Sequence, residues 1–168
     1  MFVTYIWIVP IWLRSVIFTL LLPGLIAGYA PYWLVTGSTP MPLDLGVFRW
    51  LGLLPLGLGL VMYLNTTWHF GAEGRGTPAP WDPPRQLVTS ALHAWVRNPM
   101  YLGVLSCILG EAFLWQAGVL FVYCPLIWLL FHVRVLVYEE PVLKREFGAA
   151  FDAYVARVPR WVPRRPAT

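Results

Sequence analysis

Long apolar stretches without charge are the feature that most limits what this chain can fold into. Residues 15–43 contain no charged side chain, whereas a helix that spans a membrane needs only about 20 apolar residues. The whole chain is 58% hydrophobic and only 12% charged, against about 25% charged residues in ordinary soluble domains. We therefore predict an all-α integral membrane protein, because helices satisfy their own backbone hydrogen bonds in lipid.

The apolar stretches predict about four transmembrane helices within one domain that covers residues 1–168. A retained, Trp-rich segment at residues 1–13 comes first, and the spans follow at residues 13–36, 46–67, 99–116 and 118–137. Apolar residues then recur three and four positions apart within residues 139–158, at Leu143, Phe147, Phe151, Tyr154 and Val158. This pattern predicts a C-terminal amphipathic helix that lies at the membrane surface or folds back over the bundle.

The basic residues predict how the chain is oriented in the membrane. They concentrate in the polar loop at residues 69–98 and in the tail, whereas the loop at residues 37–45 has none (Arg75, Arg85, Arg97; Lys144, Arg145, Arg157, Arg160, Arg164, Arg165). Because loops rich in Lys and Arg stay in the cytoplasm, we expect the N-terminus, the long loop and the tail to face the cytoplasm. The protein would then lie in the cell or inner membrane. Its net charge of +4 fits an anionic leaflet, and we expect no nucleic-acid partner.

Two polar clusters flank the last pair of predicted spans. Residues 97–103 read Arg-Asn-Pro-Met-Tyr-Leu-Gly, and residues 138–143 read Tyr-Glu-Glu-Pro-Val-Leu. Each has a simple structural explanation alone: the first as an interfacial anchor, the second as an acidic, proline-containing helix start. A hairpin of two spans would bring both to the same membrane face, however. This juxtaposition favours a functional site at that face.

Three further residues within the apolar stretches bear on function. Cys107 and Cys124 lack the spacing of metal ligands, so we expect no metal site. Glu111 is a carboxylate at membrane depth, which makes it a candidate functional group. It could equally approach the outer interface near Trp115 and Gln116, and the sequence leaves both readings open.

Several segments, taken in order, resemble a known family. They are residues 76–88 (Gly-Thr-Pro-Ala-Pro-Trp-Asp-Pro-Pro-Arg-Gln-Leu-Val), the cluster at 97–103, residues 139–148 (Glu-Glu-Pro-Val-Leu-Lys-Arg-Glu-Phe-Gly), Tyr154, and Val158-Pro159-Arg160. This order resembles the isoprenylcysteine carboxyl methyltransferases and covers about residues 70–160. The pieces at residues 98–103 and 138–141 also resemble the related phosphatidylethanolamine N-methyltransferases.

The resemblance implies an integral membrane methyltransferase that uses S-adenosyl-L-methionine without a soluble Rossmann-type domain. It places the cofactor pocket at residues of the two clusters (Arg97, Asn98, Pro99, Tyr101, Leu102, Gly103, Glu139 and Glu140), with Arg97 and Glu140 as candidate catalytic residues. Carboxylates and aromatic faces suit the ammonium and sulfonium groups of this cofactor.

One segment departs from the family pattern. Many relatives read Gly-Pro-Tyr-Arg-Tyr just before the Arg-(His/Asn)-Pro motif, whereas this chain has Ala-Leu-His-Ala-Trp at residues 91–95. We expect His93 and Trp95 to line the cofactor pocket in place of tyrosine, since both offer a ring face and a polar edge.

The methyl acceptor is expected to be a lipid or a lipid-like small molecule that reaches the site from the bilayer. An isoprenylcysteine carboxylate is the first interpretation and a phospholipid amine is the alternative. A non-catalytic membrane protein that retains the fold is a third possibility, from a different functional class.

Overall fold

The computed structural model describes residues 10–37, 41–74 and 85–166, and the regular elements of this part of the chain are all helices. Parts of two predicted segments, residues 1–9 and 75–84, lie outside the described residues. The elements in chain order are α1 (Ile11–Leu21), η2 (Leu25–Tyr29), α2 (Ala30–Thr36), η3 (Gly46–Gly52), α3 (Leu53–Ala72), η4 (Ala91–Ala94), α4 (Pro99–Leu114), α5 (Gly118–Arg134), η5 (Val135–Glu139), α6 (Glu140–Phe147) and α7 (Ala149–Arg157).

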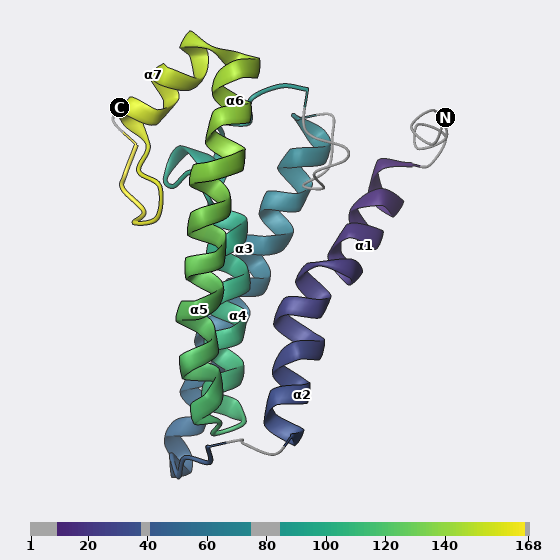
Figure 1. Ribbon diagram of the computed structural model, residues 1–168, viewed down its shortest axis with the longest axis vertical. Coiled ribbons are helices and arrows are strands. Elements are labelled where there is room, and N and C mark those ends of the chain that lie inside the picture. Colours follow the sequence, from purple (N-terminus) through teal and green to yellow (C-terminus); the bar gives the residue numbers. More distant parts are fainter. Residues whose placement is uncertain (1–9, 38–40, 75–84, 167–168) are drawn as a thin grey trace.

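The helices form an elongated bundle in which the chain runs along the long axis in alternating directions (Figure 1). Three helical stretches of the described chain are long and apolar enough to span a membrane: Trp12–Thr36, Gly46–Ala72 and Gly118–Phe147. The fourth apolar helix, α4, has 16 residues, which corresponds to about 24 Å at 1.5 Å per residue. That length is below the roughly 30 Å of a bilayer core. The all-α membrane fold is therefore confirmed, with α4 shorter than predicted.

Helix α4 lies inside the bundle, in contact with both α3 and α5. The core is built around it, and the largest cluster of buried apolar residues comprises Phe18, Tyr63, Met100, Val104, Leu105, Ile108, Ile127 and Phe131. Glycines bring α3 and α4 into backbone contact: a methyl group at Gly59 would lie 2.5 Å from the Gly103 carbonyl oxygen. Such close approach of backbones is typical of small residues at helix interfaces in membranes. Gly103 of the predicted site thus packs against a helix.

The helix that contains the last predicted span continues past Val137. Helix α5 continues through η5 into α6, and the whole stretch from Gly118 to Phe147 is helical. The sequence predicted a separate helix there, because Glu139, Glu140 and Pro141 are typical of a helix start. A π-type turn at Val135–Glu139 lies just before that proline, and the helix continues through it. The first span also has a π-type turn before a proline, η2 ahead of Pro31, but Ala27 within it has non-helical φ and ψ of −111° and 17°, so the helix is kinked there.

The predicted tail helix at residues 139–158 is divided in two at Gly148. This residue has φ of +50°, a conformation that glycine adopts readily, and the chain reverses there so that α7 folds back beside the bundle (Figure 1). The apolar residues of the predicted pattern still face inward: Phe151, Tyr154 and Val158 are buried, and Leu143 and Phe147 pack against them. The periodicity thus identified the buried face correctly and missed the turn.

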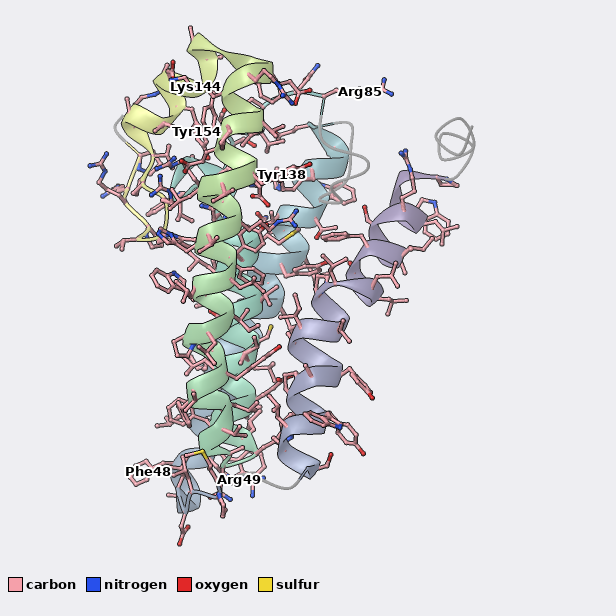
Figure 2. The ribbon with its side chains drawn as sticks, in the orientation of Figure 1. Phe48, Arg49, Arg85, Tyr138, Lys144 and Tyr154 are labelled. Atoms are coloured by element: carbon pink, nitrogen blue, oxygen red, sulfur yellow. The ribbon has the colours of Figure 1, made fainter. Side chains whose placement is uncertain are left out.

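The two ends of the bundle differ in character. Figure 2 shows Lys144, Arg85, Tyr138 and Tyr154 toward one end and Phe48 and Arg49 at the other. At the Arg49 end, the backbone N–H of Gly118 donates to the Met41 carbonyl over 2.8 Å. We refer to the opposite, more charged end as the Lys144 end.

Candidate active site

A cavity of about 480 Å³ lies in the Lys144 half of the bundle. Its walls come from the first span, α3, the segment around η4, α4, α5 and α6. The part toward the middle of the bundle is apolar, lined by residues such as Phe18, Leu22, Ile26 and Val104. The polar lining comes from the two sequence clusters together with His93, Arg134, Glu146 and Tyr154. The cavity therefore combines an apolar part with a polar part, as binding sites for amphiphilic small molecules do.

Glu139 lies at the centre of the first polar group in this cavity. The hydroxyl of Tyr101 donates a hydrogen bond to Glu139 Oε1, and the Nε–H of Arg134 donates to the same oxygen over 2.8 Å. Arg134 Nε also lies 3.1 Å from the Tyr101 hydroxyl. The Tyr101 ring stacks on Phe131, with 4.3 Å between the ring centroids. Both hydrogen bonds to the Glu139 side chain from described residues end on Oε1, so Oε2 remains available to a ligand.

Glu140 belongs to a second group and is used differently. Arg97 donates to its Oε1 over 2.7 Å, and Arg160 holds both carboxylate oxygens over 2.7 and 2.8 Å. The Arg97 side chain is only 11% exposed, and burial lowers its pKa, which the charge of Glu140 counteracts. For Arg160 the hydrogen bond to Glu140 raises the pKa. Arginine side chains keep their charge in proteins, and the Glu140 carboxylate joins these two.

The C-terminal segment after α7 fixes the Arg97–Asn98 turn in place. The backbone N–H of Arg97 donates to the Pro159 carbonyl over 2.9 Å, and the Asn98 amide donates to the Arg160 carbonyl over 3.1 Å. Farther along, the Trp161 indole donates to His132 Nδ1 over 2.9 Å. We call residues 158–161 the strap, because their contacts hold the Arg97–Asn98 turn in place. Sequence reasoning used Arg160 only for orientation, although Val158-Pro159-Arg160 was part of the family-like run.

His93 lies in the short helix η4 and lines the same cavity. Its side chain is buried, with the residue only 6% exposed, and its ring meets the Phe70 ring edge to face at 5.3 Å. The Tyr154 hydroxyl donates to the His93 carbonyl over 2.8 Å, which ties η4 to α7. Burial lowers the pKa of His93 to about 4, and the nearby His69 lowers it further in the same direction. The imidazole is therefore neutral at pH 7.

The structure brings together most of the residues that the sequence singled out. His93, Arg97, Asn98, Pro99, Tyr101 and Glu139 line the large cavity. Glu140 borders a smaller adjacent cavity of about 30 Å³, which it shares with Arg97 and Glu139. Trp95, Leu102 and Gly103 line neither cavity, and Trp95 is 44% exposed. Arg134 and Tyr154 also line the cavity, although the sequence did not assign them to the site. Arg134 donates a hydrogen bond to Glu139, and Tyr154 donates one to the His93 carbonyl.

Glu111 lies apart from this site, in the last turns of α4, and does not line either cavity. One of its carboxylate oxygens is buried without a hydrogen-bond partner among the described residues. Neither of the two readings offered by the sequence is tested by this placement. Within the described ranges, no group of three or more His, Cys, Asp or Glu residues is arranged to hold a metal ion.

Fold and cavity define a class: a helical membrane protein with an amphiphilic cavity whose polar part is built from aromatic, arginine and glutamate side chains. Comparison with known families supplies the next step. Residues 47–150 match the family model described as phospholipid methyltransferase, and the chain belongs to this family. It is therefore a membrane methyltransferase by family. No curated protein and no solved structure matches the chain significantly.

The matched range covers α3, η4, α4, α5 and α6, so it includes both sequence clusters. It ends before the strap that carries Arg160 and Trp161. The family resemblance found in the sequence is thus confirmed for the part of the chain that surrounds the cavity.

Proposed function

We propose that this protein transfers a methyl group from S-adenosyl-L-methionine to an amphiphilic acceptor held in the large cavity. The observation that carries the proposal is the contrast between the two glutamates. Glu140 uses both of its oxygens to hold arginines, whereas Glu139 faces the cavity and has Oε2 available. A carboxylate oxygen of this kind can accept a hydrogen bond from the ammonium group of S-adenosyl-L-methionine.

The polar groups of the cavity fit the cofactor in kind. Glu139 suits a cationic group, since charge-assisted hydrogen bonds to a carboxylate are the strong ones. Arg97 lines the cavity, and its Nε is buried without a partner in the described chain, so it can donate to a carboxylate. The Tyr101 ring offers an aromatic face, which attracts cations. When bound, S-adenosyl-L-methionine supplies an electrophilic methyl group on a sulfonium centre.

The chain's own residues would act mainly by positioning. Arg134 and Tyr101 fix the orientation of the Glu139 carboxylate through hydrogen bonds to Oε1. Glu140, Arg160 and the strap fix Arg97 from the other side. Preorganisation of this kind lowers the entropic cost of aligning reactants, which accounts for much of the rate in transfer reactions of this type.

Of the two acceptors that the sequence left open, we propose a phospholipid amine over an isoprenylcysteine carboxylate. The proposal is supported by the matched family model, which is described as phospholipid methyltransferase.

The apolar part of the cavity would receive the acyl chains, which places the acceptor in the bilayer. The polar part lies toward the Lys144 end. We propose that this end faces the cytoplasm, because α6 and α7, which carry Lys144, Arg145 and Arg157, lie there (Figure 1).

Cofactor binding to the purified full-length protein, measured by titration calorimetry in detergent, tests the proposal. We expect Glu139→Gln to weaken S-adenosyl-L-methionine binding by tenfold or more, which corresponds to roughly 1.4 kcal/mol. The matched control is Asp152→Asn, which removes a carboxylate of an exposed pair with Lys144 outside the cavity. If Glu139→Gln binds the cofactor like the parent protein, the assignment of Glu139 is wrong.

A further inference from the structure

His93 carries a polar atom for which the described protein provides no partner. Its Nδ1 is buried and accepts or donates no hydrogen bond among the described residues, and the whole residue is 6% exposed. A buried polar atom without a partner costs about 1–3 kcal/mol. Such atoms are rare in native structures and often mark a functional position.

The surroundings of His93 hold the ring firmly. The backbone N–H donates to the Ser90 carbonyl over 2.9 Å, and the carbonyl accepts from the Tyr154 hydroxyl. Phe70 packs edge to face against the imidazole. Because both backbone groups are bonded and the ring is packed, the side chain has little freedom to seek another partner. His93 is among the residues that line the large cavity, so a ligand held there lies beside this residue.

The charge state of the ring decides what kind of partner fits. The titratable groups whose charges act on His93 are His69, which disfavours its protonation, and Glu73, which favours it. Desolvation outweighs both and keeps the imidazole neutral at pH 7. A neutral imidazole has one N–H and one lone pair. In the tautomer with the proton on Nε2, Nδ1 presents a lone pair, which attracts a donor and repels a carboxylate oxygen.

We propose that His93 Nδ1 accepts a hydrogen bond from an amino group of a bound ligand, which makes this site select amines. The inference rests on the proposed function and deepens it. Two ligands of that function carry amino groups: the cofactor, and an acceptor with a primary amine headgroup. His93 is thus a specificity-determining residue that stands where many relatives have a tyrosine.

Substitution of the ring tests the proposal while preserving its packing. His93→Phe keeps a flat ring against Phe70 and removes the acceptor, and Trp95→Phe is the control on the exposed neighbour in the same segment. Binding of S-adenosyl-L-methionine is measured by calorimetry, and the KM for a vesicle-borne phosphatidylethanolamine acceptor is measured with cofactor at saturation. If the cofactor supplies the amino group, His93→Phe weakens cofactor binding by about tenfold. If the acceptor supplies it, cofactor binding is unchanged and the KM for the acceptor rises by about tenfold.

Nitrogen NMR of histidine-labelled protein gives a readout that a merely structural role would not change. The Nδ1 resonance of His93, assigned by its loss in His93→Phe, should shift on addition of the ligand that supplies the amino group. The proposal is overturned if His93→Phe alters neither binding nor KM, or if the Nδ1 resonance is the same with and without both ligands. Failure of the parent protein to bind the cofactor would instead refute the proposed function, so the two failures are distinguishable.

Discussion

Glu140 pairs with two arginines and Glu139 with one. We therefore predict that substitution of the two glutamates changes the stability of the protein by different amounts. Glu140→Gln keeps the shape of the side chain and removes its charge, so that Arg97 and Arg160 lose their shared anion. Three hydrogen bonds from cationic donors end on this carboxylate. Such bonds contribute about 1.5–3 kcal/mol each, and breaking a buried pair costs roughly 3–5 kcal/mol.

The structure places this cost at the lower end of that range. The glutamine retains one acceptor oxygen, and the side chains of Glu140 and Arg160 are 21% and 29% exposed, so water compensates part of the loss. We expect Glu140→Gln to reduce the free energy of unfolding by about 3 kcal/mol. Glu139→Gln should cost less than about 1 kcal/mol, because its partner Arg134 is 34% exposed.

Reversible unfolding in mixed micelles, followed by circular dichroism, measures these differences. The exposed Lys144–Asp152 pair provides the scale for a surface interaction, and Asp152→Asn should change stability by no more than about 0.5 kcal/mol. If Glu140→Gln is as stable as the parent and has lost cofactor affinity, Glu140 contacts the ligand and our division of roles is refuted.

Three further predictions concern pH, packing and topology. The pKa of His93 is about 4 in the folded protein and 6.5 in the unfolded chain. Between these pH values the unfolded chain binds more protons than the folded protein, so the free energy of unfolding falls by roughly 3 kcal/mol as the pH drops from 7 to 4. This dependence should flatten in His93→Phe in thermal melts, and an unchanged slope would contradict the burial of a neutral ring. Gly59→Val should destabilise the bundle by at least about 2 kcal/mol, because a Cβ at this position would lie 2.5 Å from the Gly103 carbonyl oxygen. Gly57→Val is the control in the same unfolding assay and should be close to neutral, because the space around its Cβ is open. In a cysteine-free background, Thr89→Cys should react with an impermeant thiol reagent from the cytoplasmic side and Asp44→Cys from the other side, and reversed labelling would refute the orientation.

The sequence was sufficient to predict the fold class and the meeting of the two clusters. Both depend on long-range patterns that the bilayer enforces, namely uninterrupted apolar stretches and a hairpin whose ends must return to one face. The start of α4 at Pro99 was predictable for a local reason, since proline is favoured at the first helical position.

Other features depend on contacts that the sequence does not reveal. The Glu-Glu-Pro run at residues 139–141 indicated the start of a separate helix, yet the helix continues through a π-type turn at Val135–Glu139. The different roles of Glu139 and Glu140 follow from successive helical residues pointing about 100° apart, which is visible only once Arg97, Arg134 and Arg160 have been placed. Trp95 was expected in the pocket beside His93, but the turn of η4 buries His93 and leaves Trp95 exposed.

The position of Arg160 could have been inferred only in part. It lies beyond the residues that match the family model, and its bond to Glu140 joins residues 20 positions apart in sequence. The chain reversal at Gly148 makes this contact possible, and a lone glycine in an amphipathic stretch is a weak signal of a turn.

Methyl transfer by the purified protein in lipid nanodiscs tests the central claim most directly. The nanodiscs would contain phosphatidylethanolamine, and S-adenosyl-L-methionine labelled with tritium in its methyl group would be added, followed by extraction of the lipids. We predict that label appears on the headgroup nitrogen with the parent protein and with Asp152→Asn, and that it falls at least tenfold with Glu139→Gln. Absence of label from the lipids, together with absence of cofactor binding by the parent protein, would contradict the proposed activity.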